Sequence, residues 1–181
     1  MEHLSTNLFI VAGTGSRSLQ NATPAEKQAV FAYLVLQLTA LKDKYGDNLR
    51  VMTGMAEGFD KALMVAAISL NIKVIAAIPN KGYGKYYWGR KSLTGTNRLE
   101  EFNNLLEQAD EVVYVAEDVY GTRDIYITRD GKKVHTNFVR NEYMVEKADA
   151  FYVYDPSSAG TRHAFKLIRD ARKPHKLVPV E

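Results

Sequence analysis

The chain has 181 residues, 46% of them hydrophobic and 25% charged, with a formal net charge of +3 at pH 7. This length can bury a substantial core in one domain, and the slight positive charge does not by itself support nucleic-acid binding. The absence of cysteine excludes disulfides, thiolate metal sites and a cysteine nucleophile. The sequence shows neither a signal-peptide pattern nor a long apolar run, so we expect a cytoplasmic protein without a membrane partner.

Apolar, strand-like runs recur along the chain. Most of them are nearly continuous Val, Ile and Ala, which is typical of strands covered on both faces, as in a parallel sheet. The predicted strands are Leu8–Ala12, Leu49–Thr53, Lys73–Ile78, Glu111–Ala116, Ala150–Tyr154 and Lys176–Val180.

Helical periodicity fills the intervals between these strands. A capping box, Thr23-Pro24-Ala25-Glu26, predicts the start of the first helix, whose apolar face holds Val30, Leu34, Leu38, Leu41 and Tyr45. Further helices are expected at about 60–70, over Leu99, Phe102, Leu106 and Ala109, at about 137–147 and at about 161–172. The alternation predicts an α/β fold with a Rossmann-like, doubly wound, mainly parallel sheet flanked by helices.

Two segments interrupt the alternation. Residues Lys81–Lys91 form a loop rich in glycine, aromatic residues and cations. Residues 118–135 contain an Asp-Gly pair between two short β-prone runs. That pattern predicts a small inserted β-hairpin before the fourth helix.

Glycine-containing turns follow three of the predicted strands, at Gly13–Ser18, Thr53–Asp60 and Ser157–Thr161. Glycine lets the backbone approach an anion closely, and a helix N-terminus adds partial positive charge. Because the C-terminal ends of parallel strands meet at one edge of a sheet, we expect the turns to form one crevice that holds a nucleotide.

The first turn differs from the usual dinucleotide fingerprint. It lacks the third glycine, and Thr53 stands where the second strand would end in a ribose-binding acidic residue. No phosphate loop of the Gly-x4-Gly-Lys-Ser/Thr form is present. Ordinary NAD-binding and ATPase functions are therefore disfavoured, and no cofactor is expected.

Four motifs follow one another along the chain: Gly15-Ser16-Arg17, Thr53-Gly54-x3-Gly58-x-Asp60, Arg140-Asn141-x2-Met144-Val145-x2-Ala148-Asp149 and Gly160-Thr161. Together they resemble the SLOG superfamily, which is named after the DNA-processing protein DprA and the LOG-type phosphoribohydrolases. The resemblance covers nearly the full chain and is greatest to the stand-alone branch of YspA- and YpsA-like proteins. It implies a single SLOG-like domain over residues 1–181 that binds a nucleotide or nucleotide-derived ligand at the strand C-terminal ends.

The hydrolase branch of that superfamily carries a Pro-Gly-Gly-x-Gly-Thr-x-Glu-Glu motif, whose glutamate works with an upstream arginine on the N-glycosidic bond. Arg140 aligns with this arginine, but His163 and Ala164 stand where the carboxylates should be. An oxocarbenium-like transition state needs an anion, which histidine cannot supply. No catalytic residue is therefore assigned, and Glu57 and Asp60 are the candidates if the protein is an enzyme.

The candidate ligand-binding residues come from the three turns, the aromatic loop and the fourth helix. They are Gly13, Thr14, Gly15, Ser16, Arg17, Gly54, Glu57, Asp60, Tyr87, Trp88, Arg140, Asn141, Ser158, Gly160 and Thr161. Amides, hydroxyls and the two arginines would hold phosphate, while Tyr87 and Trp88 would stack a base. No metal is expected, because the four histidines show no metal-ligand spacing.

Several candidates also have a purely structural interpretation. The first turn can be a tight strand-to-helix corner, and Thr161 can cap its helix through its hydroxyl. Asp60 can favour a helix start rather than accept hydrogen bonds from a ribose, and Glu57 is expected to face solvent. Arg140 can be a solvated surface side chain, and the aromatic loop can pack as an edge or in an oligomer contact.

Three functions remain open. The favoured one is a binding module, forming a dimer or higher homo-oligomer, that senses or sequesters a nucleotide-derived small molecule such as a signalling nucleotide. The second is a LOG-like or deoxyribosyltransferase-like enzyme that acts at the N-glycosidic bond of nucleotides through Glu57 or Asp60. The third is DprA-like binding of single-stranded nucleic acid, against which the low net charge argues.

Overall fold

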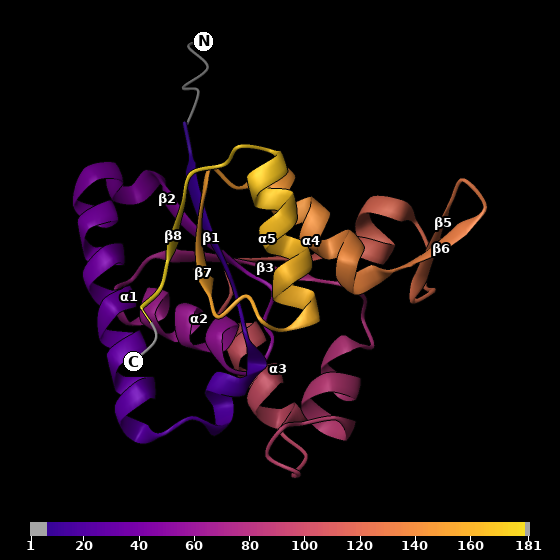
Figure 1. The fold of residues 1–181 in the computed structure, drawn as a ribbon, viewed down its shortest axis with the longest axis horizontal. Helices are drawn as coiled ribbons and strands as arrows, with labels where there is room; N and C mark the ends of the chain where they lie inside the picture. Colours follow the sequence, from indigo (N-terminus) through magenta and orange to yellow (C-terminus); the bar gives the residue numbers. More distant parts are fainter. Residues whose placement is uncertain (1–6, 180–181) are drawn as a thin grey trace.

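A six-stranded parallel sheet forms the centre of the molecule (Figure 1). The structure is a computed structural model that describes residues 7–179. The strands lie in the order β4-β3-β2-β1-β7-β8, and each neighbouring pair is parallel. Their bounds are β1 (Phe9–Gly15), β2 (Leu49–Thr53), β3 (Lys73–Ile78), β4 (Glu111–Tyr114), β7 (Ala150–Tyr154) and β8 (His175–Leu177).

Helices connect the strands and cover both faces of the sheet, which confirms the predicted fold class. The helices are α1 (Pro24–Tyr45), α2 (Phe59–Ser69), α3 (Leu99–Glu107), α4 (Thr136–Lys147) and α5 (Ala159–Asp170). The predicted hairpin is also confirmed, as β5 (Tyr126–Arg129) paired antiparallel with β6 (Lys132–His135). It projects from the body of the molecule beyond α4 (Figure 1).

Side chains that alternate along each strand enter two separate hydrophobic cores. Val51 packs with residues of α1, α2 and α3, whereas Met52, the next residue of β2, packs with residues of α4 and α5. Since successive strand residues point to opposite faces, strands buried on both sides must be apolar throughout. This explains the continuous Val, Ile and Ala runs.

Some boundaries differ from the predictions for identifiable reasons. β1 extends to Gly15 because Gly13 and Gly15 still pair with β7. β4 ends at Tyr114, where the backbone N–H donates to Oδ2 of Asp118 at 2.8 Å and the chain enters a π-helical turn. The last strand is His175–Leu177, and Val180 of the prediction lies outside the described residues.

The capping box at the start of α1 is only half formed. Thr23 Oγ1 accepts a hydrogen bond from the Glu26 N–H at 3.2 Å, as predicted. The Glu26 carboxylate accepts from the Tyr154 hydroxyl at 2.6 Å and so joins α1 to the end of β7. Within residues 7–179, none of the helices is long and apolar enough to cross a membrane.

The strand order reverses direction between β1 and β7. β2, β3 and β4 lie on one side of β1, while β7 and β8 lie on the other. The connections that leave β1 and β7 therefore diverge, and a crevice opens between them at the C-terminal ends of the strands.

Candidate functional site

A cavity of about 460 Å³ lies at this reversal point. Its walls come from the end of β1, the starts of α2, α4 and α5, and the segment between β3 and α3. Open α/β sheets commonly bind ligands at this position. The predicted site residues that line the cavity are Thr14, Gly15, Ser16, Arg17, Asp60, Tyr87, Arg140, Asn141, Ser158, Gly160 and Thr161.

The predicted set and the observed lining differ in both directions. Four predicted residues are buried without lining the cavity: Gly13, Gly54, Glu57 and Trp88. The lining residues that were not among the candidates are Ser18, Asn21, Ala56, Tyr83, Leu93 and Asn137, although Ser18, Ala56 and Tyr83 lie in the predicted turns and aromatic loop. Asn137 could have been found, because it opens the predicted fourth helix one turn before Arg140 and Asn141, whereas Asn21 and Leu93 carried no signal.

Packing between β1 and α2 explains the glycines of the first turn. A Cβ at Gly13 would lie 2.5 Å from Cδ2 of Leu63, and one at Gly15 would overlap the ring of Phe59. Glycine is therefore required here so that α2 can approach the sheet closely. Close packing of α2 on the strand, rather than a tight corner, thus accounts for both glycines.

The chain leaves β1 through a short 3-10 helix, Arg17–Asn21, and not through a long helix. Ser16 caps this segment, since its Oγ accepts from the Ser18 N–H at 3.1 Å. The long helix α1 begins only at Pro24. The long helix thus begins at the predicted capping box, away from the first turn, and the turn itself contributes hydroxyls and Arg17.

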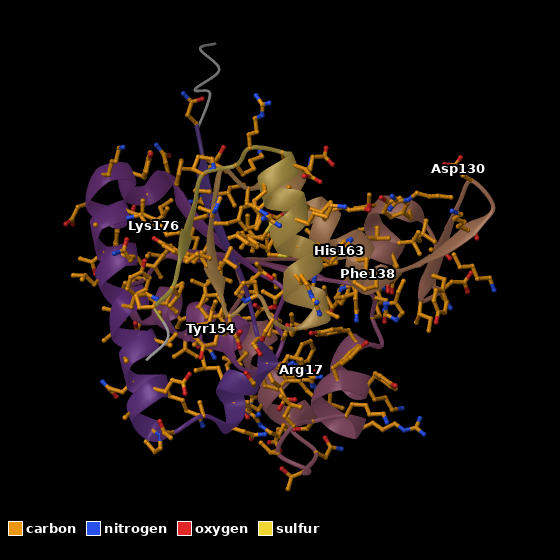
Figure 2. The ribbon with its side chains drawn as sticks, viewed as in Figure 1. Arg17, Asp130, Phe138, Tyr154, His163 and Lys176 are labelled. Atoms are coloured by element: carbon orange, nitrogen blue, oxygen red, sulfur yellow. The ribbon has the colours of Figure 1, made fainter. Side chains whose placement is uncertain are left out.

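Arg17 reaches from the first turn to the segment between β3 and α3. Its Nη2 donates to Oε1 of Glu57 at 3.0 Å and to the carbonyl of Lys91 at 3.1 Å. The guanidinium carbon lies 5.5 Å from the ring centroid of Tyr87. Figure 2 shows Arg17 at the C-terminal end of β1. Arg17 thus links the end of β1 to the segment between β3 and α3, which places Tyr87 in the lining of the cavity.

Glu57 is fully buried, contrary to the expectation that it faces solvent. Its carboxylate accepts hydrogen bonds from Arg17, from Nη1 of Arg98 at 2.6 Å, from Oγ of Ser92 at 2.9 Å and from the N–H of Leu93 at 3.0 Å. Through these partners the Glu57 carboxylate joins its own turn before α2 to the turn after β1 and to the segment that precedes α3. Glu57 does not line the cavity, so its role in the site is structural.

Trp88 also differs from its expected role. It has no exposed surface, because the π-helical segment Gly84–Arg90 turns its ring inward, where Nε1 donates to the carbonyl of Met55 at 2.7 Å. Its ring packs against Phe102, with 5.6 Å between centroids. Trp88 therefore cannot stack a base, and Tyr87 and Tyr83 supply the aromatic wall instead.

Asp60 combines a structural contact with an unused oxygen. Its Oδ2 accepts from the Ala56 N–H at 3.2 Å, while Oδ1 is buried and has no partner among the described residues. Burial raises the pKa of Asp60 to about 6, although the charge of Arg140 and the Ala56 hydrogen bond each lower it. One oxygen thus supports the turn before α2, and the other makes no hydrogen bond with the described residues.

Arg140 is buried rather than solvated, with 8% of its surface exposed. Its Nη1 donates to the carbonyls of Gly54 at 2.7 Å and Ala77 at 3.2 Å, and so connects the C-terminal ends of β2 and β3. A Cβ at Gly54 would overlap this guanidinium, which explains the glycine. Arg140 places a positive charge at the cavity and also holds its floor together.

The N-terminus of α5 faces the cavity. Ser158 precedes the helix, and its Oγ donates to Oγ1 of Thr161 at 3.0 Å, so Thr161 does not cap the helix as expected. Asn141 holds α4 to this end, because its Nδ2 donates to the Gly160 carbonyl at 3.3 Å. The first N–H groups of a helix lack intrahelical partners and attract anions.

His163 stands where the hydrolase motif would have a glutamate, and it does not line the cavity. Its ring packs on Phe138, with 4.5 Å between centroids. Both residues are labelled in Figure 2, where α4 and α5 lie side by side. Burial lowers the pKa of His163. The side chain therefore contributes to the contact between α4 and α5.

Unpaired buried polar atoms gather at this cavity. Nε of Arg17, Oδ1 of Asp60 and Oδ1 of Asn137 have no hydrogen-bond partner, and among the described residues only Oε1 of Glu117 shares that condition. Each such atom costs about 1–3 kcal/mol, and native proteins contain few of them. One donor and two acceptors, all on residues that line this cavity, thus lack a partner among the described residues.

Solved structures with the same fold were found for this chain. DNA processing protein A from Streptococcus pneumoniae aligns at 16% identity and a TM-score of 0.62, over 97% of this chain and 52% of that one. The molybdenum cofactor carrier protein from Chlamydomonas reinhardtii aligns at 12% identity and a TM-score of 0.53, over 93% and 76%. The protein TM1055 aligns at 13% identity and a TM-score of 0.56, over 93% and 72%.

The three neighbours share the fold of this chain over 93–97% of its length, which confirms the predicted Rossmann-like α/β fold. At these identities the likeness concerns the fold alone, and the chain spans about half the length of DNA processing protein A. No protein-family model matches the chain. No curated protein matches it either.

Proposed function

We propose that this protein binds a nucleotide or nucleotide-derived small molecule in the cavity between β1 and β7, as a sensor or a sequestering protein. The observation that carries the proposal is the group of unpaired buried atoms of Arg17, Asp60 and Asn137 around one cavity at the reversal point of the sheet. A ligand with both donors and acceptors would satisfy all three.

The phosphate of such a ligand would lie at the start of α5. Gly160 and Thr161 lie at the positive end of the helix dipole, and Ser158 adds a hydroxyl. Arg140 adds a full charge from the other side of the cavity. Backbone N–H groups together with a guanidinium are a common combination for phosphate.

The nucleoside would lie against the aromatic wall. The rings of Tyr83 and Tyr87 are 4.9 Å apart between centroids, and both residues line the cavity. Aromatic faces stack on bases without requiring a particular sequence. Oδ1 of Asp60 remains available to accept a hydrogen bond from a ribose hydroxyl or a base N–H.

We further propose that the chain is one SLOG-type domain of the stand-alone YspA- and YpsA-like branch, and that it self-associates. Light scattering during size-exclusion chromatography tests the second point. A monomer at all concentrations would contradict it.

Calorimetric titration with nucleoside monophosphates, and native mass spectrometry of the freshly purified protein, test the binding proposal. We expect a one-site isotherm with at least one nucleotide or a retained small molecule of nucleotide mass. Because one structural neighbour is named as a DNA processing protein, a single-stranded oligonucleotide is titrated in parallel. Tight, strongly salt-dependent binding of the oligonucleotide alone would favour nucleic acid instead.

Cleavage of an N-glycosidic bond is a second candidate, favoured by one observation. Asp60 lines the cavity, and its raised pKa of about 6 suits a group that exchanges a proton near neutral pH. Incubation with nucleoside monophosphates, followed by chromatography, tests this function. Release of free base that is abolished by Asp60→Asn would establish it, and intact nucleotides after long incubation would exclude it for those compounds.

A further inference from the structure

Asn137 lines the cavity, and one atom of its side-chain amide has no partner among the described residues. Its Nδ2 donates to the hydroxyl of Tyr87 at 2.7 Å, and its backbone N–H donates to Nδ1 of His135 at 3.0 Å. Its Oδ1 is buried and has no partner among residues 7–179. One N–H of the amide is thus engaged by Tyr87, while Oδ1 accepts from no described residue, so a donor on a ligand can satisfy it.

The charges around the cavity favour this orientation of the amide. Arg17 and Arg140 both line it, and the Arg17 guanidinium lies 5.5 Å from the Tyr87 ring centroid. In a cavity lined by two cations, an amide is more stable with its oxygen toward the cavity and its nitrogen toward the Tyr87 oxygen. The terminal torsion of an asparagine is broad, so a small rotation exposes Oδ1 to a ligand.

Asn137 lies at the end of the cavity where a base would stack. Along α4 it is one turn before Asn141, which contacts the start of α5 through the Gly160 carbonyl. The helix therefore runs from the aromatic wall at Asn137 to the proposed phosphate position at Asn141. A nucleotide with its phosphate at α5 and its base on Tyr87 would direct a base edge at Asn137.

We propose that Asn137, oriented by Tyr87, selects nucleotides whose base carries an exocyclic amino group, such as adenine or cytosine, over bases with a hydrogen or a keto oxygen at that position. This inference rests on the proposed function and names its ligand class. An amino group donates to Oδ1, whereas a keto oxygen would face another acceptor and leave Oδ1 unpaired.

Two matched pairs of ligands test the proposal by calorimetry: AMP against purine riboside 5′-monophosphate, and CMP against UMP. Within the pair that binds, we expect the amino-bearing member to bind about tenfold more tightly, since a buried acceptor left without a partner is costly. Equal affinities, or tighter binding of the keto or unsubstituted member, would overturn the inference while leaving nucleotide binding intact. No binding of any of the four, and no retained nucleotide, would overturn the proposed function itself.

Variants separate selection from general binding. Tyr87→Phe removes the acceptor that holds Nδ2, so the amide can turn over and the amino preference should fall from about tenfold to below about threefold. Tyr86→Phe makes the same change one residue away, on a side chain that does not line this cavity, and should keep the preference. Asn137→Ala should lose it, and Asn137→Asp, which retains acceptors, should keep it.

The readout of these variants is the ratio of two affinities, which a general loss of packing does not change. Circular dichroism checks that each variant is folded. A preference that survives both Tyr87→Phe and Asn137→Ala would overturn the assignment to this pair of residues.

Discussion

Nη1 of Arg98 lies 2.6 Å from Oε2 of Glu57, a carboxylate with no exposed surface. Arg98 precedes α3 and Glu57 precedes α2, so this ion pair fixes the segment between β3 and α3 against the sheet. That segment carries Tyr87 and Leu93, which form one wall of the cavity. The shape of the candidate site therefore depends on a pair of residues outside it.

Replacing Glu57 by Gln should destabilise the protein by about 3–5 kcal/mol, because it removes the buried carboxylate charge that Arg17 and Arg98 share. Urea unfolding at neutral pH measures the change. Glu101→Gln is the matched control, since Glu101 contacts the same arginine with a side chain that is 37% exposed. A surface ion pair contributes about 1 kcal/mol or less. Equal effects of the two substitutions would contradict the role given to Glu57.

Asp60 should make the stability depend on pH. Burial raises its pKa from 3.8 to about 6 in the folded protein, so its contribution to the free energy of unfolding is fully present below the unfolded value and is lost as the pH rises through the folded one. The loss amounts to about 3 kcal/mol between about pH 4 and pH 7.

The variant Asp60→Asn isolates this contribution, because all other titrating groups are unchanged. We expect it to be more stable than the parent near neutral pH and equal to it at about pH 4. Urea unfolding of both proteins across this range measures the difference. Two stability curves that run parallel would show that Asp60 is not the group responsible.

Gly160→Asp should abolish phosphate binding without harming the fold. A Cβ at Gly160 meets no atom within 4 Å, so the new side chain fits, and an acidic residue at a helix N-terminus is favourable by about 0.3–1 kcal/mol. Its carboxylate would occupy the proposed phosphate position and repel the ligand. We expect nucleotide affinity to fall at least about tenfold, with an unchanged or higher melting temperature.

Gly160→Asn is nearly isosteric with that variant and uncharged, and it serves as its control. It should retain most of the affinity in the same titration. Similar losses in both variants would indicate crowding rather than charge, and would move the phosphate away from α5.

Trp88→Ala should act on stability through the core, since Trp88 is fully buried and its Nε1 donates to Met55. Truncating a buried aromatic side chain costs about 3–5 kcal/mol. Trp88→Phe should cost less, because only the hydrogen bond and part of the ring are removed. Denaturant midpoints of the two variants, compared with Tyr86→Ala at an exposed tyrosine, test the order.

Arg140→Ala should affect both ligand binding and the fold. Arg140 lines the cavity with a positive charge, so its removal should weaken nucleotide binding in a calorimetric titration. Because Arg140 donates to the carbonyls of Gly54 and Ala77, its removal should also destabilise the ends of β2 and β3.

The strands, the helices and the hairpin could be read from the sequence because their signals are local. Continuous apolar runs such as Lys73–Ile78 report burial on both faces of a sheet, and Asp130-Gly131 reports a tight turn. The positions of the glycine turns at strand ends followed from the same pattern. So did most of the residues that line the cavity, including Asp60, Arg140 and Thr161.

The sequence by itself thus determined which elements form and which ends of the strands meet, since periodicity and turn chemistry act over a few neighbouring residues. Only the tertiary structure decided what individual polar and aromatic side chains do there. Trp88 turns into the core, Glu57 is enclosed by Arg17 and Arg98, and Asn137 faces the cavity. The positions of these side chains depend on contacts with residues far apart in the chain, which the crossover connections of the sheet bring together. A local sequence pattern therefore cannot predict them.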